Sequence, residues 1–238
     1  MQKIAIIIPC YNESERLKES FIEDLINFTL VDIFLVNDGS KDNTLSIING
    51  FSERYSDRCF VIHYETNEGK ASAIFKSSNQ IISDFQYDIV GYFDADFSTP
   101  VEETKILIHE MLTGKNEFIL GSRIMLLNSE IKRKTYRHII GRIIITIIDL
   151  RFKLGIYDTQ CGAKLFSADI IRQVFNKPFK TSWLFDIEIF LRLKKINLLK
   201  KGREIPIYNW KDIEGSKLEM KTCFKIVKEL YLLFKTYK

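Results

Sequence analysis

The sequence predicts an α/β fold in one domain, with a mostly parallel central sheet flanked by helices. Over the first 125 residues, short apolar segments alternate with amphipathic segments of helical length. This alternation is typical of βαβ units, whose strands pair in parallel. The short segments are apolar at nearly every position, as expected of strands buried on both faces. The composition, with 46% hydrophobic and 28% charged residues in a chain of 238, is that of a globular protein with a large core.

The expected elements of the first half follow one another closely. Residues 3–8 form the first strand, which Pro9 ends, and residues 13–28 form an amphipathic helix. The further strands span residues 32–36, 59–64, 88–93 and 118–120. Asp42 or Asn43 caps the next helix, which ends near residue 55. The remaining helices of this half span residues 69–82 and 100–113, the latter opened by Pro100.

The second half of the chain alternates less regularly. Helices are expected over residues 133–153, 168–175, 185–195 and 217–237, and strands over residues 163–166 and 204–208. No linker or internal repeat separates this part from the first. We therefore expect one domain over residues 1–238, made of a first half, 1–125, and a second half, 126–238.

The charge of the chain is small in total but unevenly distributed. A net charge of +4 does not suggest a nucleic-acid-binding protein. Residues 123–153, however, carry eight basic and two acidic side chains, and residues 215–238 carry six and two. Because both segments are also amphipathic, we expect them to meet substrate phosphate and the anionic lipids of a membrane surface. The alternative is a pair of core-facing helices with a solvated basic side.

The cysteines and the apolar runs indicate a cellular location. Four cysteines occur without C-x-x-C spacing, which argues against a zinc site or a redox pair and favours reduced thiols. No signal-peptide pattern is visible, and no apolar run reaches the length of a membrane span. We expect a cytoplasmic protein that is peripheral on the cytoplasmic face of the membrane.

Two carboxylates one residue apart, Asp94 and Asp96, follow the expected strand 88–93. Ligands bind at the carboxyl ends of the strands in sheets of this kind. Carboxylate oxygens are preferred ligands of Mg²⁺ and Mn²⁺, commonly together with substrate phosphates. The motif therefore predicts a metal site, although a solvated turn is the alternative for so short a pattern.

Two further polar segments follow expected strands. In residues 9–13 (PCYNE), Tyr11 is suited to lie against a base and Glu13 to bind a ribose; the alternative is a strand-to-helix turn with Asn12 as the N-cap. In residues 37–40 (NDGS), Asp38 is suited to accept a hydrogen bond from a base or ribose. A turn and a helix cap would explain the glycine and serine of this segment, but they leave Asp38 without a role.

Taken in order and with their spacing, these segments resemble the family 2 glycosyltransferases, which have the nucleotide-sugar-binding GT-A fold. The resemblance rests on IIIPCYNE, LVNDGSKDNT, NEGK at residues 67–70 and the Asp94-Ala95-Asp96 motif. Residues 158–166 (DTQCGAKLF), 183–188 (WLFDIE) and 214–217 (EGSK) look like the polyprenyl-phosphate sugar synthases, most of all the dolichyl-phosphate glucosyltransferase branch. The chain departs from the family pattern at Asn37, where an aspartate is usual, and from the mannosyl branch at Ser98, where that branch has glutamine.

The resemblance implies a nucleotide-sugar-binding half over residues 1–125 and an acceptor-binding half, with basic amphipathic helices, over 126–238. The nucleotide-sugar-binding residues it implies are Pro9, Tyr11, Glu13, Asp38, Lys70, Asp94, Arg123 and Lys217. The implied ligands of Mg²⁺ or Mn²⁺ are Asp94 and Asp96. The implied catalytic residues are Asp186, Glu188 and Arg123, and the implied acceptor-binding residues are Arg137, Gln160 and Lys164.

The implied activity is an inverting, metal-dependent transfer of a hexose, with glucose favoured, from a nucleotide sugar to a polyprenyl or dolichyl phosphate. UDP-glucose is the favoured donor, and GDP-mannose is the alternative. A lipid phosphate is already an anionic nucleophile, whereas a sugar hydroxyl would need Asp186 or Glu188 as a general base. A family 2 enzyme that glycosylates a hydroxyl of a surface polysaccharide is thus a second hypothesis. A third, of another class, is a non-catalytic nucleotide-sugar-binding partner of a membrane protein.

Overall fold

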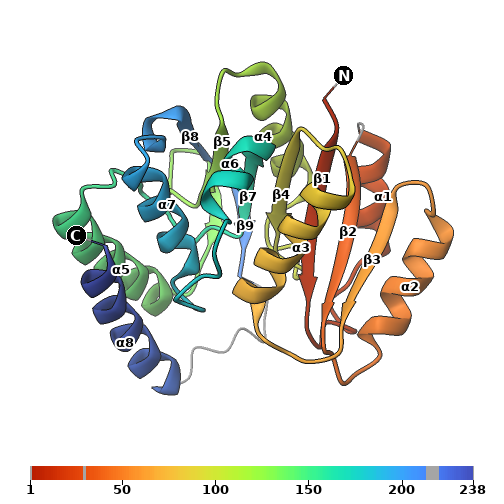
Figure 1. Cartoon of the computed structure of the whole chain (residues 1–238), viewed down its shortest axis with the longest axis horizontal. Coiled ribbons are helices and arrows are strands. Elements are labelled where there is room, and N and C mark those ends of the chain that lie inside the picture. Colours follow the sequence, from red (N-terminus) through yellow and green to blue (C-terminus); the bar gives the residue numbers. More distant parts are fainter. Residues whose placement is uncertain (1, 29–30, 213–219, 238) are drawn as a thin grey trace.

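The structure, a computed structural model, describes residues 2–28, 31–212 and 220–237. A seven-stranded sheet in the order β3-β2-β1-β4-β7-β5-β8 lies at its centre (Figure 1). The strands are β1 (Ile4–Cys10), β2 (Val31–Asp38), β3 (Cys59–Tyr64), β4 (Ile89–Phe93), β5 (Phe118–Ser122), β7 (Ala163–Ser167) and β8 (Gly202–Pro206). Neighbouring strands are parallel, except that β7 runs antiparallel to both β4 and β5. The expected mostly parallel sheet is confirmed.

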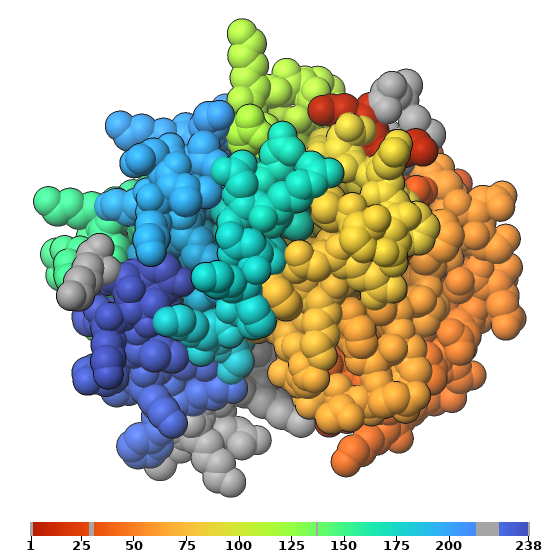
Figure 2. Space-filling view, viewed as in Figure 1, coloured from red at the N-terminus to blue at the C-terminus, as the bar shows by residue number. Residues whose placement is uncertain are grey.

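Helices cover both faces of the sheet. Side chains of α1 (Glu19–Phe28), α2 (Thr44–Arg54) and α4 (Val101–Thr113) join one apolar cluster. A second cluster, on the other face, includes side chains of α3 (Lys70–Asp84), α5 (Thr135–Phe152), α6 (Ala168–Val174), α7 (Phe185–Lys195) and α8 (Met220–Thr236). In Figure 2 the segments that contain α3 (yellow), α6 (cyan) and α8 (dark blue) lie on one face of the molecule.

The apolar strands contribute side chains to both clusters because successive side chains of a strand point to opposite faces. In β1, Ile4, Ile6 and Ile8 join the first cluster, whereas Ala5 and Ile7 join the second. All five are at most 1% exposed. The uninterrupted apolar run at residues 4–8 is therefore required by a strand that has helices on both of its faces.

The register of the strands brings the polar segments to one edge of the sheet. Cys10, at the end of β1, pairs with Asn37 of β2, and Ile7 of the same strand pairs with Tyr92 of β4. Because β7 is antiparallel, its first residue, Ala163, pairs with Phe93 at the end of β4. The segments after β1, β2 and β4 and the segment before β7 thus meet at this edge.

The helix α8 is tied to the rest of the domain by a buried carboxylate. Glu229, which is 7% exposed, accepts hydrogen bonds from the backbone N–H groups of Ser182 (3.1 Å), Trp183 (3.0 Å) and Leu184 (2.9 Å). These groups precede α7, where backbone donors have no partner within the helix. A side chain of α8 therefore caps the start of α7.

Three short elements have no signal in the sequence. The strands β6 (Glu130–Lys132) and β9 (Asn209–Lys211) pair in parallel as a small second sheet, and η1 (Leu199–Lys201) is a 3₁₀ turn. Segments of three residues are too short to show a periodic pattern. The small sheet joins the segment after β5 to the segment after β8.

The helix after β1 starts later than the sequence predicts. It begins at Glu19 rather than at residue 13, since the N–H groups of Arg16 and Leu17 bond to the carbonyl of Glu13 in a tight turn. Asn12 is not its N-cap: its φ is +54°, and its side chain accepts the Lys41 N–H at 2.8 Å. The expected helix 185–195 coincides with α7. The expected helix 217–237 is described from Met220 onward as α8.

Within the described ranges, none of the helices combines the length and the apolar character that crossing a bilayer requires.

Candidate active site

Asp38, at the end of β2, organises the loop that leads into α3. Its carboxylate is 3% exposed and accepts the N–H groups of Glu68 (3.1 Å) and Gly69 (2.8 Å). Gly39 has a φ of +64°, and a Cβ there would lie 2.5 Å from the backbone nitrogen of Asn67. Asp38 therefore has a structural role, which the sequence did not indicate. Each carboxylate oxygen can still accept a further hydrogen bond.

This loop places Lys70, the first residue of α3, at the metal motif. The ammonium of Lys70 pairs with Oδ1 of Asp94 and lies 5.8 Å from the ring centroid of Tyr92 and 5.9 Å from that of Phe185. Burial acts to lower the pKa of Lys70, but the carboxylates of Asp94 and Asp186 outweigh burial and the pKa is raised. Lys70 is therefore a fixed positive charge beside the motif.

Gly162, in the segment before β7, packs against the other carboxylate oxygen of Asp94, Oδ2. A Cβ at residue 162 would lie 1.7 Å from Oδ2 of Asp94. The backbone can approach the carboxylate so closely only where a residue lacks a side chain. The glycine of DTQCG is thus explained by its contact with the first aspartate of the metal motif.

The donor set at Asp94 and Asp96 fits a hard divalent cation. Oδ1 of Asp96 accepts the N–H of Ser98 at 2.9 Å. Burial raises the pKa of Asp96, and the neighbouring negative charge of Asp94 raises it further. A cation would relieve this repulsion, with diphosphate and water supplying further ligands. In the described part of the chain, no group of three or more His, Cys, Asp or Glu side chains forms a complete metal site by itself.

The segment after β1 lies at the same edge. Tyr11 is 40% exposed there, as a side chain available to stack on a base would be. The N–H of Glu13 donates to Oγ1 of Thr44 at 2.8 Å, and its carboxylate pairs with Arg16 at 2.6 Å. Burial raises the pKa of Glu13 to about 7, even though the pair with Arg16 acts in the opposite direction. Pro9, at the end of β1, is half-buried.

Arg123 is held by an aspartate that the site prediction did not include. Its Nε and Nη2 atoms donate to the two carboxylate oxygens of Asp158 at 2.6 and 2.9 Å. Both side chains are at most 10% exposed, and the guanidinium lies 5.1 Å from the ring centroid of Trp210. The expectation that Arg123 binds the nucleotide sugar therefore meets an obstacle, since the edge of the guanidinium that carries Nε and Nη2 is occupied by Asp158. Asp158 begins the DTQCG segment, which was the available sequence signal.

Lys164 and Asp186 form a buried ion pair behind this edge. Lys164 is 0% exposed and donates to Oδ1 of Asp186 at 2.6 Å, and the Tyr92 hydroxyl donates to the same oxygen at 2.5 Å. The expectation that Lys164 contacts an acceptor is corrected, because a fully buried ammonium has no access to a ligand. Asp186 is 5% exposed, and its carboxylate raises the pKa of Lys70. It therefore lies close to the metal motif.

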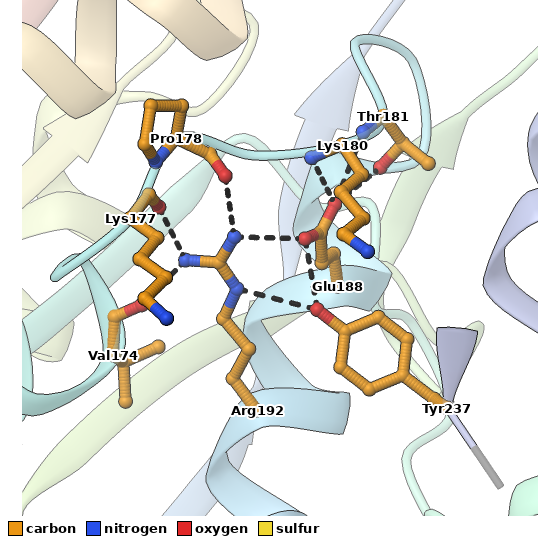
Figure 3. A network of polar contacts seen from close by, with 8 residues as sticks. All are labelled: Val174, Lys177, Pro178, Lys180, Thr181, Glu188, Arg192 and Tyr237. Carbon is orange, nitrogen blue, oxygen red and sulfur yellow. Dashed lines mark hydrogen bonds and ion pairs between the residues drawn. The ribbon is translucent and has the colours of Figure 1, made fainter.

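Glu188 does not lie with Asp38, Lys70, Asp94 and Asp96 at the edge of the sheet. Figure 3 shows its carboxylate in a closed network. Oε2 accepts the N–H groups of Lys180 (2.8 Å) and Thr181 (3.0 Å), and Oε1 accepts Nη2 of Arg192 and the hydroxyl of Tyr237, both at 2.8 Å. The side chain is 0% exposed. A carboxylate so enclosed is a structural anion, and the expected role as a general base has no geometric support.

The predicted acceptor residues are only partly described. Gln160 lines a small pocket beside the start of α5, together with Arg133, His138, Arg142 and Thr159. Arg137 lies in α5, but its side chain is outside the described part of the structure, as is the whole of Lys217. Arg133 was not among the site residues expected from the sequence.

Known proteins resemble the chain over nearly its whole length. A dolichyl-phosphate beta-glucosyltransferase of Trichomonas vaginalis is 30% identical over 250 residues, which cover 99% of this chain and 74% of that protein. The dolichyl-phosphate beta-glucosyltransferase of Saccharomyces cerevisiae is 28% identical over 260 residues, covering 98% of this chain and 75% of that protein.

Solved structures confirm the expected GT-A fold. The crystal structure of glucosyl-3-phosphoglycerate synthase from Mycobacterium tuberculosis in complex with UDP has a TM-score of 0.72 at 16% identity, over 99% of this chain and 80% of that one. The family model described as glycosyl transferase family 2 matches residues 5–175, which is more than half of the chain. The chain therefore belongs to glycosyl transferase family 2.

Proposed function

We propose that the protein transfers glucose from UDP-glucose to dolichyl phosphate or a related polyprenyl phosphate, with inversion at the anomeric carbon. The observation that carries this proposal is the convergence of Asp38, Lys70, Asp94 and Asp96 at one edge of the sheet. The relatives named dolichyl-phosphate beta-glucosyltransferase, which cover nearly the whole chain, support the choice of sugar and acceptor.

In this mechanism the first half of the chain holds the donor. Tyr11 stacks on the base, and Asp38 accepts a hydrogen bond from the nucleoside with its remaining acceptor capacity. Asp94 and Asp96 would hold Mg²⁺ or Mn²⁺, which would neutralise charge on the diphosphate when bound. Lys70 adds a fixed positive charge beside it. These groups stabilise the negative charge that develops as the bond between C1 and the UDP oxygen breaks.

The acceptor supplies its own nucleophile. An oxygen of the lipid phosphate attacks C1 of the sugar from the face opposite to UDP, so a new C1–O bond forms as UDP leaves. This step requires no proton transfer from the phosphate, because the attacking oxygen is already ionised. The engagement of Asp186 by Lys164 and Tyr92, and of Glu188 by its closed network, fits a reaction without a general base.

The outer faces of α5 and α8 support a peripheral position on the cytoplasmic face of the membrane. Side chains on one side of α5 are exposed, among them Ile139 (51%), Ile143 (54%), Ile147 (40%) and Leu150 (78%). On α8, Phe224 (77%), Val227 (65%) and Tyr231 (69%) are exposed. The inner face of α5 is also apolar, with Ile144 and Ile148 buried, so the core does not account for the outer residues.

The two helices are neighbours, and basic side chains accompany their apolar faces. Phe152 of α5 and Phe234 of α8 are in edge-to-face contact, with ring centroids 5.4 Å apart. Lys225, Lys228 and Lys235 are exposed on α8. We define the membrane-facing surface as Ile139, Ile143, Ile147, Leu150, Phe224, Val227 and Tyr231. Apolar side chains with lysines beside them suit the interface of an anionic bilayer.

A transfer assay with labelled donors tests the proposed reaction. Purified protein is incubated with UDP-glucose or GDP-mannose, with dolichyl phosphate or a sugar acceptor, and with Mn²⁺ or EDTA. We expect transfer from UDP-glucose to dolichyl phosphate only when Mn²⁺ is present. Asp96→Asn should abolish Mn²⁺-dependent donor binding, whereas Asp57→Asn, at an exposed site, should not. Transfer to a sugar hydroxyl alone, or donor binding without any transfer, would overturn the proposal.

A further inference from the structure

Arg133 is a half-buried guanidinium beside the proposed active site. It follows β6, precedes α5 and lines the same pocket as Asp158 and Gln160. Burial lowers its pKa and the nearby charge of Arg123 lowers it further, and together they outweigh the carboxylates of Asp158 and Asp212, which act to raise it. An arginine in such a place needs a partner, because a partly desolvated charge is unfavourable unless it is paired.

No protein carboxylate fills this role within the described ranges. Asp158, which lines the same pocket, directs both of its oxygens to Arg123 instead. Across the described part of the chain, Arg133 has neither a hydrogen bond nor an ion pair with an acidic side chain. By contrast Arg142, which lines the same pocket, stacks on the Tyr157 ring at 4.0 Å and donates to the Tyr157 carbonyl at 3.0 Å. The contacts of Arg142 within the protein thus explain its position, whereas Arg133 has no such polar contact among the described residues.

The helix α5 is adapted to the guanidinium of Arg133. Gly141 lies in the interior of α5, where glycine is destabilising relative to alanine. A Cβ at residue 141 would lie 3.2 Å from Nη2 of Arg133 and 3.9 Å from its Cζ. The absence of a side chain at residue 141 therefore leaves room for the guanidinium of Arg133 against the helix. The helix accepts a poor helix former at the one place where an alanine would crowd Arg133.

The remaining walls of the pocket are suited to an anion near the donor. Thr159 and Gln160 contribute a hydroxyl and an amide, and His138 lies on the first turn of α5. The segment that holds them continues through Gly162, which contacts Asp94 of the metal motif. An anion bound at Arg133 would therefore lie beside the pair of Arg123 and Asp158, since Asp158 lines the same pocket.

We propose that Arg133, seated over Gly141, binds the phosphate monoester of the acceptor with the help of Gln160. This inference rests on the proposed function and deepens it by naming the group that recognises the acceptor phosphate. A guanidinium offers two parallel donors to phosphate oxygens, so it orients the phosphate as well as attracting it. Arg133 is therefore a binding residue for the acceptor and not for the donor.

Calorimetric titration separates the two substrates. The probes are citronellyl phosphate, a short polyprenyl monoester, inorganic phosphate, and UDP-glucose with Mn²⁺. For Arg133→Ala we expect the affinity for citronellyl phosphate to fall by about tenfold or more, since hydrogen bonds to charged groups are strong. Affinity for UDP-glucose should stay within about twofold. The matched control Lys134→Ala, which removes the adjacent exposed charge, should leave both affinities unchanged.

A second variant keeps the charge of Arg133 and fills only the space at residue 141 against which its guanidinium packs. Gly141→Ala should weaken binding of citronellyl phosphate while leaving the melting temperature unchanged or higher, because alanine favours the helix. Inorganic phosphate should bind more weakly than citronellyl phosphate but depend on Arg133 in the same way. In the transfer assay, Arg133→Ala should raise KM for the acceptor and leave KM for the donor unchanged.

Three outcomes would overturn the inference. They are unchanged affinity for citronellyl phosphate in Arg133→Ala, an equal loss of UDP-glucose affinity in that variant, and a wild-type protein that binds UDP-glucose but no phosphate monoester. In this last case donor binding stands and only the acceptor subsite fails. A wild-type protein that binds neither probe would instead contradict the proposed function itself.

Discussion

The ammonium of Lys70 occupies Oδ1 of Asp94, the first carboxylate of the metal motif. A divalent cation at this motif must therefore compete with a positive charge of the protein. We expect Lys70→Met to raise the affinity for Mn²⁺ in the absence of donor by about fivefold, since a neighbouring like charge disfavours a bound cation. Free Mn²⁺ measured by electron paramagnetic resonance gives the affinity. Lys76→Met, which removes a lysine paired with Glu68 on the same helix, should have no effect. An unchanged affinity in Lys70→Met would show that the ammonium does not compete with the metal.

The pair of Arg123 and Asp158 should contribute strongly to stability. Asp158→Ala leaves a buried guanidinium without its carboxylate, and we expect the free energy of unfolding to fall by about 3–5 kcal/mol. Urea unfolding at pH 7 measures this. Asp169→Ala, at an exposed pair with Arg172, should change it by less than about 1 kcal/mol. Equal effects of the two substitutions would contradict the assignment.

The same pair has a defined pH dependence. Burial acts to raise the pKa of Asp158, but Arg123 outweighs it and the pKa is lowered. A carboxyl group whose pKa is lowered by folding stabilises the protein above its unfolded pKa, about 3.9, and this contribution is lost as the pH falls further. The stability difference between wild type and Asp158→Ala should therefore be constant from pH 5 to 7 and shrink below about pH 4.

Glu188 should affect stability and not chemistry. In Glu188→Gln the half-buried Arg192 loses its anionic partner, and we expect the free energy of unfolding to fall by about 3 kcal/mol or more. The kcat of the folded enzyme should change little, whereas loss of a general base costs on the order of 10²–10⁴. Glu19→Gln, at an exposed pair with Arg54, is the matched control. A large loss of kcat at unchanged stability would restore the catalytic role expected from the sequence.

Glu13 should make the protein less stable as the pH rises. Its pKa is about 7 in the folded protein, against an ordinary value of 4.5, so between these values the folded state binds more protons than the unfolded state. Stability therefore falls as pH increases through this interval. Glu13→Gln should remove part of this slope and raise the melting temperature most at pH 7 and above, in buffer with EDTA. Glu53→Gln, at an exposed site, should leave the slope as it is, and a slope unchanged in Glu13→Gln would refute the shift.

The membrane-facing surface should be required for binding to anionic vesicles. The triple variant Ile143→Ser, Ile147→Ser and Tyr231→Ser removes exposed apolar area from both helices, and we expect the vesicle-bound fraction in flotation assays to fall at least about fivefold. The melting temperature should not change. Ile106→Ser with Phe85→Ser, exposed apolar sites elsewhere, is the control. Equal binding of the two variants, or conversion of a dimer to a monomer by the triple variant, would refute membrane docking here.

The first half of the fold could be predicted because its strands are continuous apolar runs. Residues 4–8 could be interpreted only as a strand covered on both faces, since such a strand needs five buried side chains in succession. The start of α1 could not be predicted, because the turn that delays it depends on backbone bonds to the Glu13 carbonyl. The strands β6 and β9 are too short to carry a periodic signal.

The arrangement of the site can be anticipated from the sequence where one loop supplies its residues, but not where partners come from distant segments. Asp94 and Asp96 are adjacent in sequence and structure. The burial of Lys164 and Glu188 depends on partners at Asp186, Arg192 and Tyr237, which no spacing rule connects to them. Arg133 was hidden among the other basic residues of its segment, and Gly141, an unfavoured residue inside an apolar helix, was the signal that could have identified it.

The cap that Glu229 provides has a consequence for biosynthesis. The start of α7 receives its hydrogen-bond acceptor from a residue some forty-five positions later in the chain. While the protein is being made, α7 can form only as an unfinished helix until α8 has left the ribosome and docked. The sheet edge with the metal motif is complete long before that moment. The segment that leads into α7 is thus fixed last, and a polypeptide that is cut short before α8 would carry the metal motif beside an unsupported α7.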